Sequence, residues 1–155
     1  AFHYVDKAQA IREKTEGRYW FNHIYSDQQG ATGLIGTSDD LARFMVALLN
    51  GGESHGTSIL SAGSTRLMGT PIVSVTKSSV NSEDDYRFGL GWFYLSKNDR
   101  VSLSHGGAGA AFVDMMRLYP NESLGIAVMA NSTYLGRTMG AEIVDTIAGL
   151  DWEDE

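Results

Sequence analysis

Apolar residues recur at helical spacing after Thr37, which makes this the clearest element of the chain. They lie three or four positions apart, the spacing that gives a helix one apolar face: Leu41, Phe44, Met45, Leu48 and Leu49. Thr37 and Asp40 have the spacing of a capping box, and Gly51 is suited to ending the helix. The pattern predicts a structural helix, with Asp39 and Asp40 as charges at its N-terminus rather than a catalytic pair.

The second half of the chain has the alternating and continuous apolar runs of strands. Four strands are expected over residues 87–95, 101–105, 110–119 and 124–131. The short, turn-rich links between several of them favour antiparallel pairing. The expected buried residues of this sheet are Leu90, Trp92, Leu103, Phe112, Met116, Leu118, Ile126 and Val128.

A second amphipathic helix is expected over residues 133–150, where it would cover the sheet. Its apolar stripe consists of Leu135, Met139, Ile143, Ile147 and Leu150. The patterns together predict an α+β fold of the α/β sandwich type, in which helices cover an antiparallel sheet of about four strands. We expect residues 1–155 to form a single domain.

The remaining segments carry weaker signals. Residues 6–14 could form a short polar helix, and the aromatic run 19–21 suggests a strand or a packed loop. A turn is expected at 51–56 and a short helix at 61–68. Residues 70–85 are polar and mostly unpatterned, which predicts an exposed loop.

Composition and charge narrow the classes of partner. The chain is 43% hydrophobic and 20% charged, as in an ordinary globular protein. Its formal net charge of −7 disfavours nucleic acid and anionic membranes, so a small molecule or a peptide is the expected partner. No apolar run is long enough to predict a membrane span, and no leader pattern predicts a signal peptide. The start at Ala1 fits a piece of a longer protein.

Cysteine and histidine usage bears on metals and cofactors. The chain has no cysteine, which excludes disulfides and thiolate catalysis and leaves the compartment open. The histidines, at positions 3, 23, 55 and 105, lack the close spacing of zinc ligands. We expect no metal and no cofactor.

A glycine-rich segment around His105 carries the strongest chemical signal. Residues 104–109 read SHGGAG and join two strand-like runs. Glycines allow another molecule to approach the main chain closely, and a histidine at such a rim is placed to act. Taken alone, the segment fits a tight turn that begins with an exposed histidine better than it fits a site.

The order of motifs around this segment resembles one family. The runs are GLIGTSDDLARF at 33–44, FGLGW at 88–92, SHGG at 104–107, LYPN at 118–121 and LGIAVMAN at 124–131. In this order they resemble the C-terminal part of the serine beta-lactamase and penicillin-binding-protein superfamily. The resemblance is to its class C-like branch, which includes esterases and D-alanyl-D-alanine peptidases. It implies a partial beta-lactamase/transpeptidase-like fold and a bacterial periplasmic or secreted protein, with a cytoplasmic location left open.

The resemblance implies three active-site motifs: S-x-x-K with the nucleophile, Y-x-N or S-x-N, and K-T-G or H-x-G. Residues 105–107 match the third. Residues 74–77 fit S-x-x-K but lie in a stretch without helical periodicity, and residues 119–121 fit Y-x-N but lie at an expected hairpin turn. Both are interpreted as chance matches. We therefore expect a C-terminal fragment that is inactive alone and whose partner is the N-terminal half of the same fold.

Site roles follow from the resemblance. It implies that the backbone N–H of Ala108 donates to the oxyanion of an acyl-transfer reaction, that Gly107 keeps the strand edge open and that His105 donates to the substrate or carries charge near it. Gly106 is assigned to substrate contact. Tyr25 is a candidate for lining the cleft, with a core or turn role as the alternative.

The presence of a histidine at position 105 narrows the expected class of substrate. Many relatives have lysine at this position, and a permanent cation suits anionic beta-lactams, whereas an ordinary histidine is mostly neutral at pH 7. The resemblance therefore favours an esterase or peptidase over a beta-lactamase. The alternative from another class is a non-catalytic module that binds a peptide or glycan at the same sheet edge. Where the rest of the fold is missing, we expect an exposed apolar patch or a self-association surface.

Overall fold

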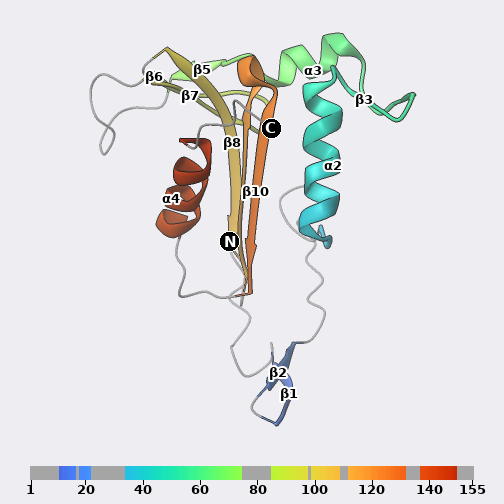
Figure 1. The fold of residues 1–155 in the computed structure, drawn as a ribbon, viewed down its shortest axis with the longest axis vertical. Coiled ribbons are helices and arrows are strands. Elements are labelled where there is room, and N and C mark those ends of the chain that lie inside the picture. The colour runs from blue at the N-terminus through green and yellow to red at the C-terminus, as the bar shows by residue number, and fades with distance from the viewer. Residues whose placement is uncertain are drawn as a thin grey trace. The chain divides into compact units, whose positions relative to one another are not determined.

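A computed structural model describes residues 11–16, 18–21, 34–74, 85–97, 99–108, 112–131 and 137–149 (Figure 1). The chain divides into two compact units, residues 1–36 and residues 37–155.

The first unit contains a β-hairpin. Strand β1 (Ile11–Thr15) pairs antiparallel with β2 (Arg18–Phe21), and Glu16 in the turn between them has a φ of 52°. Of the strand or packed loop suggested at the aromatic run, the structure has the strand. The helix expected over residues 6–14 is wrong for its described part, because β1 begins at Ile11 and pairs with the strongly β-forming run Tyr-Trp-Phe.

The second unit is built on an antiparallel sheet. Within the described chain six strands lie in the order β10-β9-β8-β7-β6-β5. Their bounds are β5 (Val73–Ser74), β6 (Asp85–Phe88), β7 (Phe93–Lys97), β8 (Arg100–Ala108), β9 (Val113–Tyr119) and β10 (Leu124–Ala130). The α+β fold with an antiparallel sheet is confirmed, but the sheet has more strands than the four expected.

One extra strand arises in the segment 87–95, which was expected as a single strand. It divides into β6 and β7, which pair with each other around a turn at residues 89–92. The Gly89 N–H donates to the Trp92 carbonyl at 2.8 Å, and Gly91 has a φ of +83°, which favours glycine. The two glycines therefore end one strand and start the next.

The second extra strand is β5, which lies inside the segment 70–85, where an exposed loop was expected, and pairs with β6.

The glycine-rich segment also differs from its prediction, because it was expected to leave the strand after His105. Instead, β8 continues through Gly106 and Gly107 to Ala108 and remains paired with β9. Glycine weakens a strand in isolation, but the ladder to β9 supplies the pairing that holds these residues extended.

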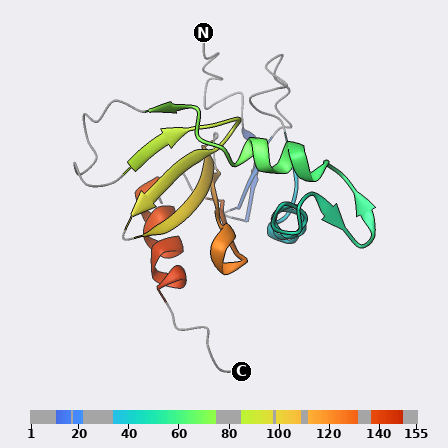
Figure 2. The ribbon, with the colours of Figure 1, turned by 90° about the horizontal axis from the view of Figure 1, so that it is seen from above.

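Helices flank the sheet. Helix α2 (Ser38–Leu49) lies on one face and α4 (Arg137–Ala148) on the other, as both views show (Figures 1 and 2). The capping box at Thr37 and Asp40 is confirmed, as is the end of the helix near Gly51, where φ is +69°. The expected short helix is α3 (Ala62–Met68), capped by Ser61. The turn at 51–56 carries the small hairpin β3 (Glu53–Ser54) and β4 (Thr57–Ser58).

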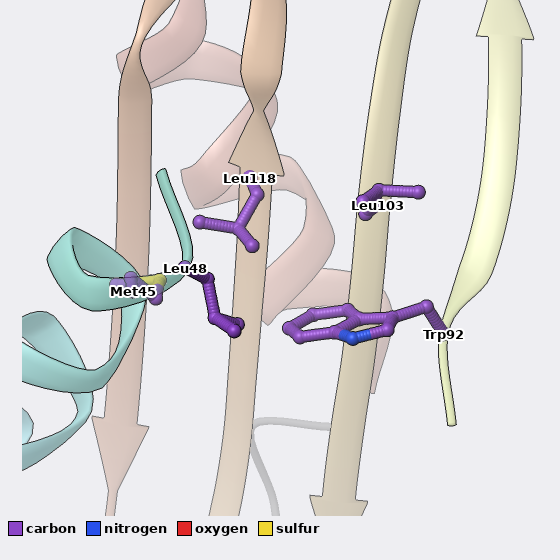
Figure 3. Close-up of a cluster of buried hydrophobic side chains, with 5 residues drawn as sticks. All are labelled: Met45, Leu48, Trp92, Leu103 and Leu118. Atoms are coloured by element: carbon purple, nitrogen blue, oxygen red, sulfur yellow. The ribbon is translucent and has the colours of Figure 1, made fainter. Parts of the chain in front are cut away.

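The core between α2 and the sheet is formed by five buried side chains. Figure 3 shows them converging from the helix and from the strand region: Met45, Leu48, Trp92, Leu103 and Leu118. Gly125 of β10 lets α2 come close, because a Cβ there would lie 3.2 Å from the Met45 Cβ. This cluster fixes β8 two residues before His105.

A second cluster joins α4 to the opposite face. It consists of Tyr119, Ile126, Val144 and Ala148. Arg100 ties the end of α4 to the sheet, because its guanidinium donates to the Ala148 carbonyl at 2.8 Å and lies 4.1 Å above the centre of the Tyr119 ring. The expected helical stripe is shifted by one residue, since Ile143 is 38% exposed while Val144 is fully buried.

The expected core residues divide into three groups. Trp92, Leu103, Leu118 and Ile126 are buried as predicted, and Met116 and Val128 are half-buried. Leu90 and Phe112 are 48% and 54% exposed, so their prediction was wrong. Both lie outside the strands, in the turn before β7 and just before β9, where strand alternation does not apply.

Candidate functional site

Strand β8 is longer than its neighbour β7, and this leaves part of its edge open. The pairing between β7 and β8 ends at Phe93 and Ser104, whereas the pairing between β8 and β9 continues to Ala108 and Val113. Among the residues that the structure describes, positions 105–108 have a strand partner on the β9 side alone. We call the other side of residues 105–108 the open edge. Its backbone groups can bind an extended ligand as an added strand.

The core next to the open edge holds it in place. Leu103 is 8% exposed and lies opposite Leu118 in the β8–β9 ladder. Trp92, which is 3% exposed, packs in the same cluster from the turn that precedes β7. The site is thus an extension of a strand anchored in the core.

His105 is the first residue of the open edge, and its side chain is exposed. The centre of its ring lies 6.0 Å from that of Phe93, with the ring planes 33° apart. Phe93 in turn stacks on Tyr86, with ring centres 5.7 Å apart. Burial raises the pKa of the Tyr86 phenol, and the charge of Arg117 opposes this shift. The histidine therefore lies at the end of an aromatic row whose tyrosine is a neutral hydroxyl at neutral pH.

The two glycines of the motif lie under side chains from β9. Gly106 faces Met115 and Gly107 faces Asp114 in the strand register. A Cβ at Gly106 would lie 3.2 Å from the Met115 Cε, and a Cβ at Gly107 would lie 2.5 Å from the Asp114 Oδ1. A larger residue at either position would make the Met115 thioether or the Asp114 carboxylate shift.

Asp114 was not expected in the site. Its pair with Gly107 lies two register positions from the pair of His105 with Met116, so Asp114 and His105 are on the same face, since alternate residues share a face. Its carboxylate has no hydrogen bond or ion pair with another residue that the structure describes. A signal was present in the sequence, because a lone acidic residue stands in the apolar run that follows the glycines.

The two segments that were interpreted as chance matches, residues 74–77 and 119–121, lie away from the open edge in sequence and, where they are described, in the sheet. Tyr119 is 5% exposed and packs against α4, and the Pro120–Glu122 turn that follows connects β9 to β10. This confirms the hairpin position. Ser74 is the last residue of β5 at the far side of the sheet order, while residues 75–77 lie outside the described residues. Tyr25 also lies outside the described residues.

The comparison with known families decides the identity. The sequence model of the family described as Beta-lactamase matches residues 3–147. The chain belongs to the beta-lactamase family. No individual curated protein matches it. The match confirms the resemblance to the serine beta-lactamase and penicillin-binding-protein superfamily, and it agrees with the observed α+β fold, which is like that of a serine hydrolase.

Two further observations bear on the site and its setting. No group of three or more His, Cys, Asp or Glu side chains is placed to hold a metal within the described ranges. The helices seen in those ranges also include none long and apolar enough to cross a membrane.

Proposed function

We propose that this beta-lactamase-family chain forms one wall of the active site of a serine hydrolase that works through an acyl-enzyme. In this proposal residues 105–107 are the H-x-G motif, and the nucleophilic serine with its lysine comes from a segment outside this sequence. The observation that carries the proposal is the open edge: an anchored strand extends past its neighbour at residues 105–108, where the motif lies.

In the reaction, the open edge binds the substrate and stabilises the negative charge that develops on it. The substrate lies along it as an added strand, and the serine oxygen attacks the acyl carbon of an ester or amide. The carbonyl oxygen gains negative charge, and the Ala108 N–H donates a hydrogen bond to it. Such a donor contributes about 3 kcal/mol of transition-state stabilisation. The alcohol or amine leaves with a proton, and water then releases the acid and regenerates the serine.

His105 serves as a donor to the substrate beside the reacting group. Its exposure leaves the ring accessible from the open edge, and its neighbour Phe93 limits the directions in which it can lie. A histidine in place of a permanent cation, together with the Asp114 carboxylate, makes the site a poor match to anionic beta-lactams. We therefore propose an ester or a peptide as the substrate.

The test compares the chain alone with the chain fused to a segment that carries the family's S-x-x-K and Y-x-N motifs. Both are assayed with a nitrophenyl ester and a chromogenic cephalosporin. We expect background rates from the chain alone and ester turnover from the fusion, lost when the serine of its S-x-x-K is replaced by alanine. Turnover by the chain alone that disappears in Ser74→Ala would show that Ser74 is the nucleophile.

The open edge also supports a second candidate, a module that binds an extended peptide without catalysis. The specific observation is the same unpaired strand segment, since addition of a peptide strand needs only main-chain partners and side-chain contacts. Peptide binding by a fusion that turns over neither substrate would favour this candidate over the hydrolase.

A further inference from the structure

The Asp114 carboxylate is placed to act on whatever lies along the open edge. Gly107 has no side chain, and the carboxylate occupies the space above it, 2.5 Å (Oδ1) and 3.1 Å (Oδ2) from the position of a Cβ. The Asp114 carboxylate comes from β9 but lies over β8, towards the side where β8 has no strand partner among the described residues.

We propose that Asp114 is a specificity-determining residue that selects a cationic side chain on the substrate and disfavours an acidic one. The inference rests on the proposed function, because it names the substrate class of the same open edge. A docked strand would lie about 4.8 Å from β8 and its side chains would alternate between the two faces. A lysine or arginine on the face of His105 and Gly107 has the length to cross the bare glycine and reach the carboxylate.

The surroundings of Asp114 favour this role over a structural one. The Asp145 carboxylate of α4 is paired with Arg117 of β9, whereas Asp114 has no ion pair within the described part of the chain. It is half-buried, so an ion pair formed there would be less screened than one on the open surface. Met129, which is opposite Asp114 on β10, is 42% exposed, so the face remains accessible on that side.

The negative charge of Asp114 also acts against substrates that carry a carboxylate. A carboxylate on the substrate would lie near the Asp114 carboxylate with Gly107 alone between them, and like charges at short range repel. The Asp114 side chain therefore both attracts one class of substrate and excludes another.

The test measures binding without turnover, so it is independent of the missing nucleophile. The 155-residue chain is titrated with three blocked peptides, Ac-Ala-X-Ala-NH₂ with Lys, Gln or Glu at X, while the amide signals of residues 106–108 are followed by NMR. We expect the lysine peptide to shift these amides and to bind at least about five-fold more tightly than the glutamate peptide. In Asp114→Asn the three affinities should become equal within about two-fold.

Asp99→Asn is the matched control. It removes the same charge by the same substitution in the turn before β8, roughly 26 Å from Gly107 at the rise of an extended strand. Asn tolerates the φ of 60° found at Asp99. This variant should keep the preference for lysine, which separates a local effect from one of net charge.

Three results would overturn the inference: a lysine preference that persists in Asp114→Asn, equal binding of the lysine and glutamate peptides by the parent chain, or no shift of the 106–108 amides with any peptide. A different result would show that the proposed hydrolase function is wrong. A chain that shows the charge preference but belongs to an assembly without ester or peptide turnover keeps this inference and loses the hydrolase.

Discussion

Gly107 and Asp114 face each other across the β8–β9 ladder, and the aspartate carboxylate fills the space where a side chain at position 107 would lie. The packing of the Asp114 carboxylate over position 107 therefore explains why a glycine suits this position of the motif. It also brings an acidic group beside His105, at the end of a strand that the core holds in place.

Replacing Gly107 tests this relationship. In Gly107→Ala the new Cβ meets the carboxylate at 2.5 Å, so Asp114 must move. We expect a loss of about 1–3 kcal/mol in the free energy of unfolding, measured by urea denaturation. Because the clash is between these two side chains, the double variant Gly107→Ala/Asp114→Ala should be more stable than the two single losses added together predict. Additive losses would place the strain elsewhere.

Gly63→Ala is the control for that series. Gly63 is a helical residue of α3, and the nearest atom to an added Cβ is the Ser61 Oγ at 3.8 Å, an ordinary contact. Alanine is a better helix former than glycine, so this variant should be more stable by about 0.5–1 kcal/mol in the same urea experiment. A destabilised Gly63→Ala would show that the packing around α3 is tighter than described.

Trp92 should be the costliest aromatic residue to remove from the described core. It is 3% exposed and packs with Leu48 and Leu103 (Figure 3). Trp92→Ala should lower the free energy of unfolding by about 3–5 kcal/mol, from the lost burial and the cavity. Leu90→Ala, two residues earlier and 48% exposed, should change it by less than about 1 kcal/mol. Similar effects in thermal unfolding of the two variants would contradict the assigned core.

The cap of α2 should give stability that depends on pH. Hydrogen bonds from the Thr37 backbone N–H and hydroxyl, each 2.8 Å, hold the pKa of Asp40 below its ordinary value. A depressed pKa means that the contribution is present above the unfolded-state value, about 3.9, and is lost as the pH falls through the lower folded-state value. The stability difference between the parent and Asp40→Ala should therefore shrink between pH 5 and pH 2, as urea unfolding would show. A constant difference would mean that the cap does not depend on the charged carboxylate.

The helices and most strands were predictable because their signals are local. Thr37, Asp40 and Gly51 are close in sequence and define α2 without help from the rest of the chain. The strand state of Gly106 and Gly107 was not predictable in this way, since the ladder to β9 overrides the preference of two adjacent glycines. The split of β6 from β7 likewise depends on the approach of Gly89 to the Thr70 carbonyl, where a Cβ would lie 2.7 Å away.

The residues of the candidate site could be proposed from the sequence only in part, for the same reason. His105 and its glycines were found from the motif. Asp114 was missed because its place opposite Gly107 depends on the register of two strands, which the residues between them do not specify. The same holds for the open edge, which depends on the relative lengths of β7 and β8.

The most direct test of the central claim is His105→Ala in the fusion that carries the nucleophile, with the ester kcat/KM and the melting temperature measured on the same preparation. His105 is exposed and its one described ring contact is with Phe93, so the melting temperature should fall by less than about 3 °C. Loss of a donor beside the reacting group should lower kcat/KM by a factor of about 30–1,000. His105→Lys should recover part of this loss. An unchanged kcat/KM together with a large fall in the melting temperature would contradict the account, because it would make His105 a structural residue of β8.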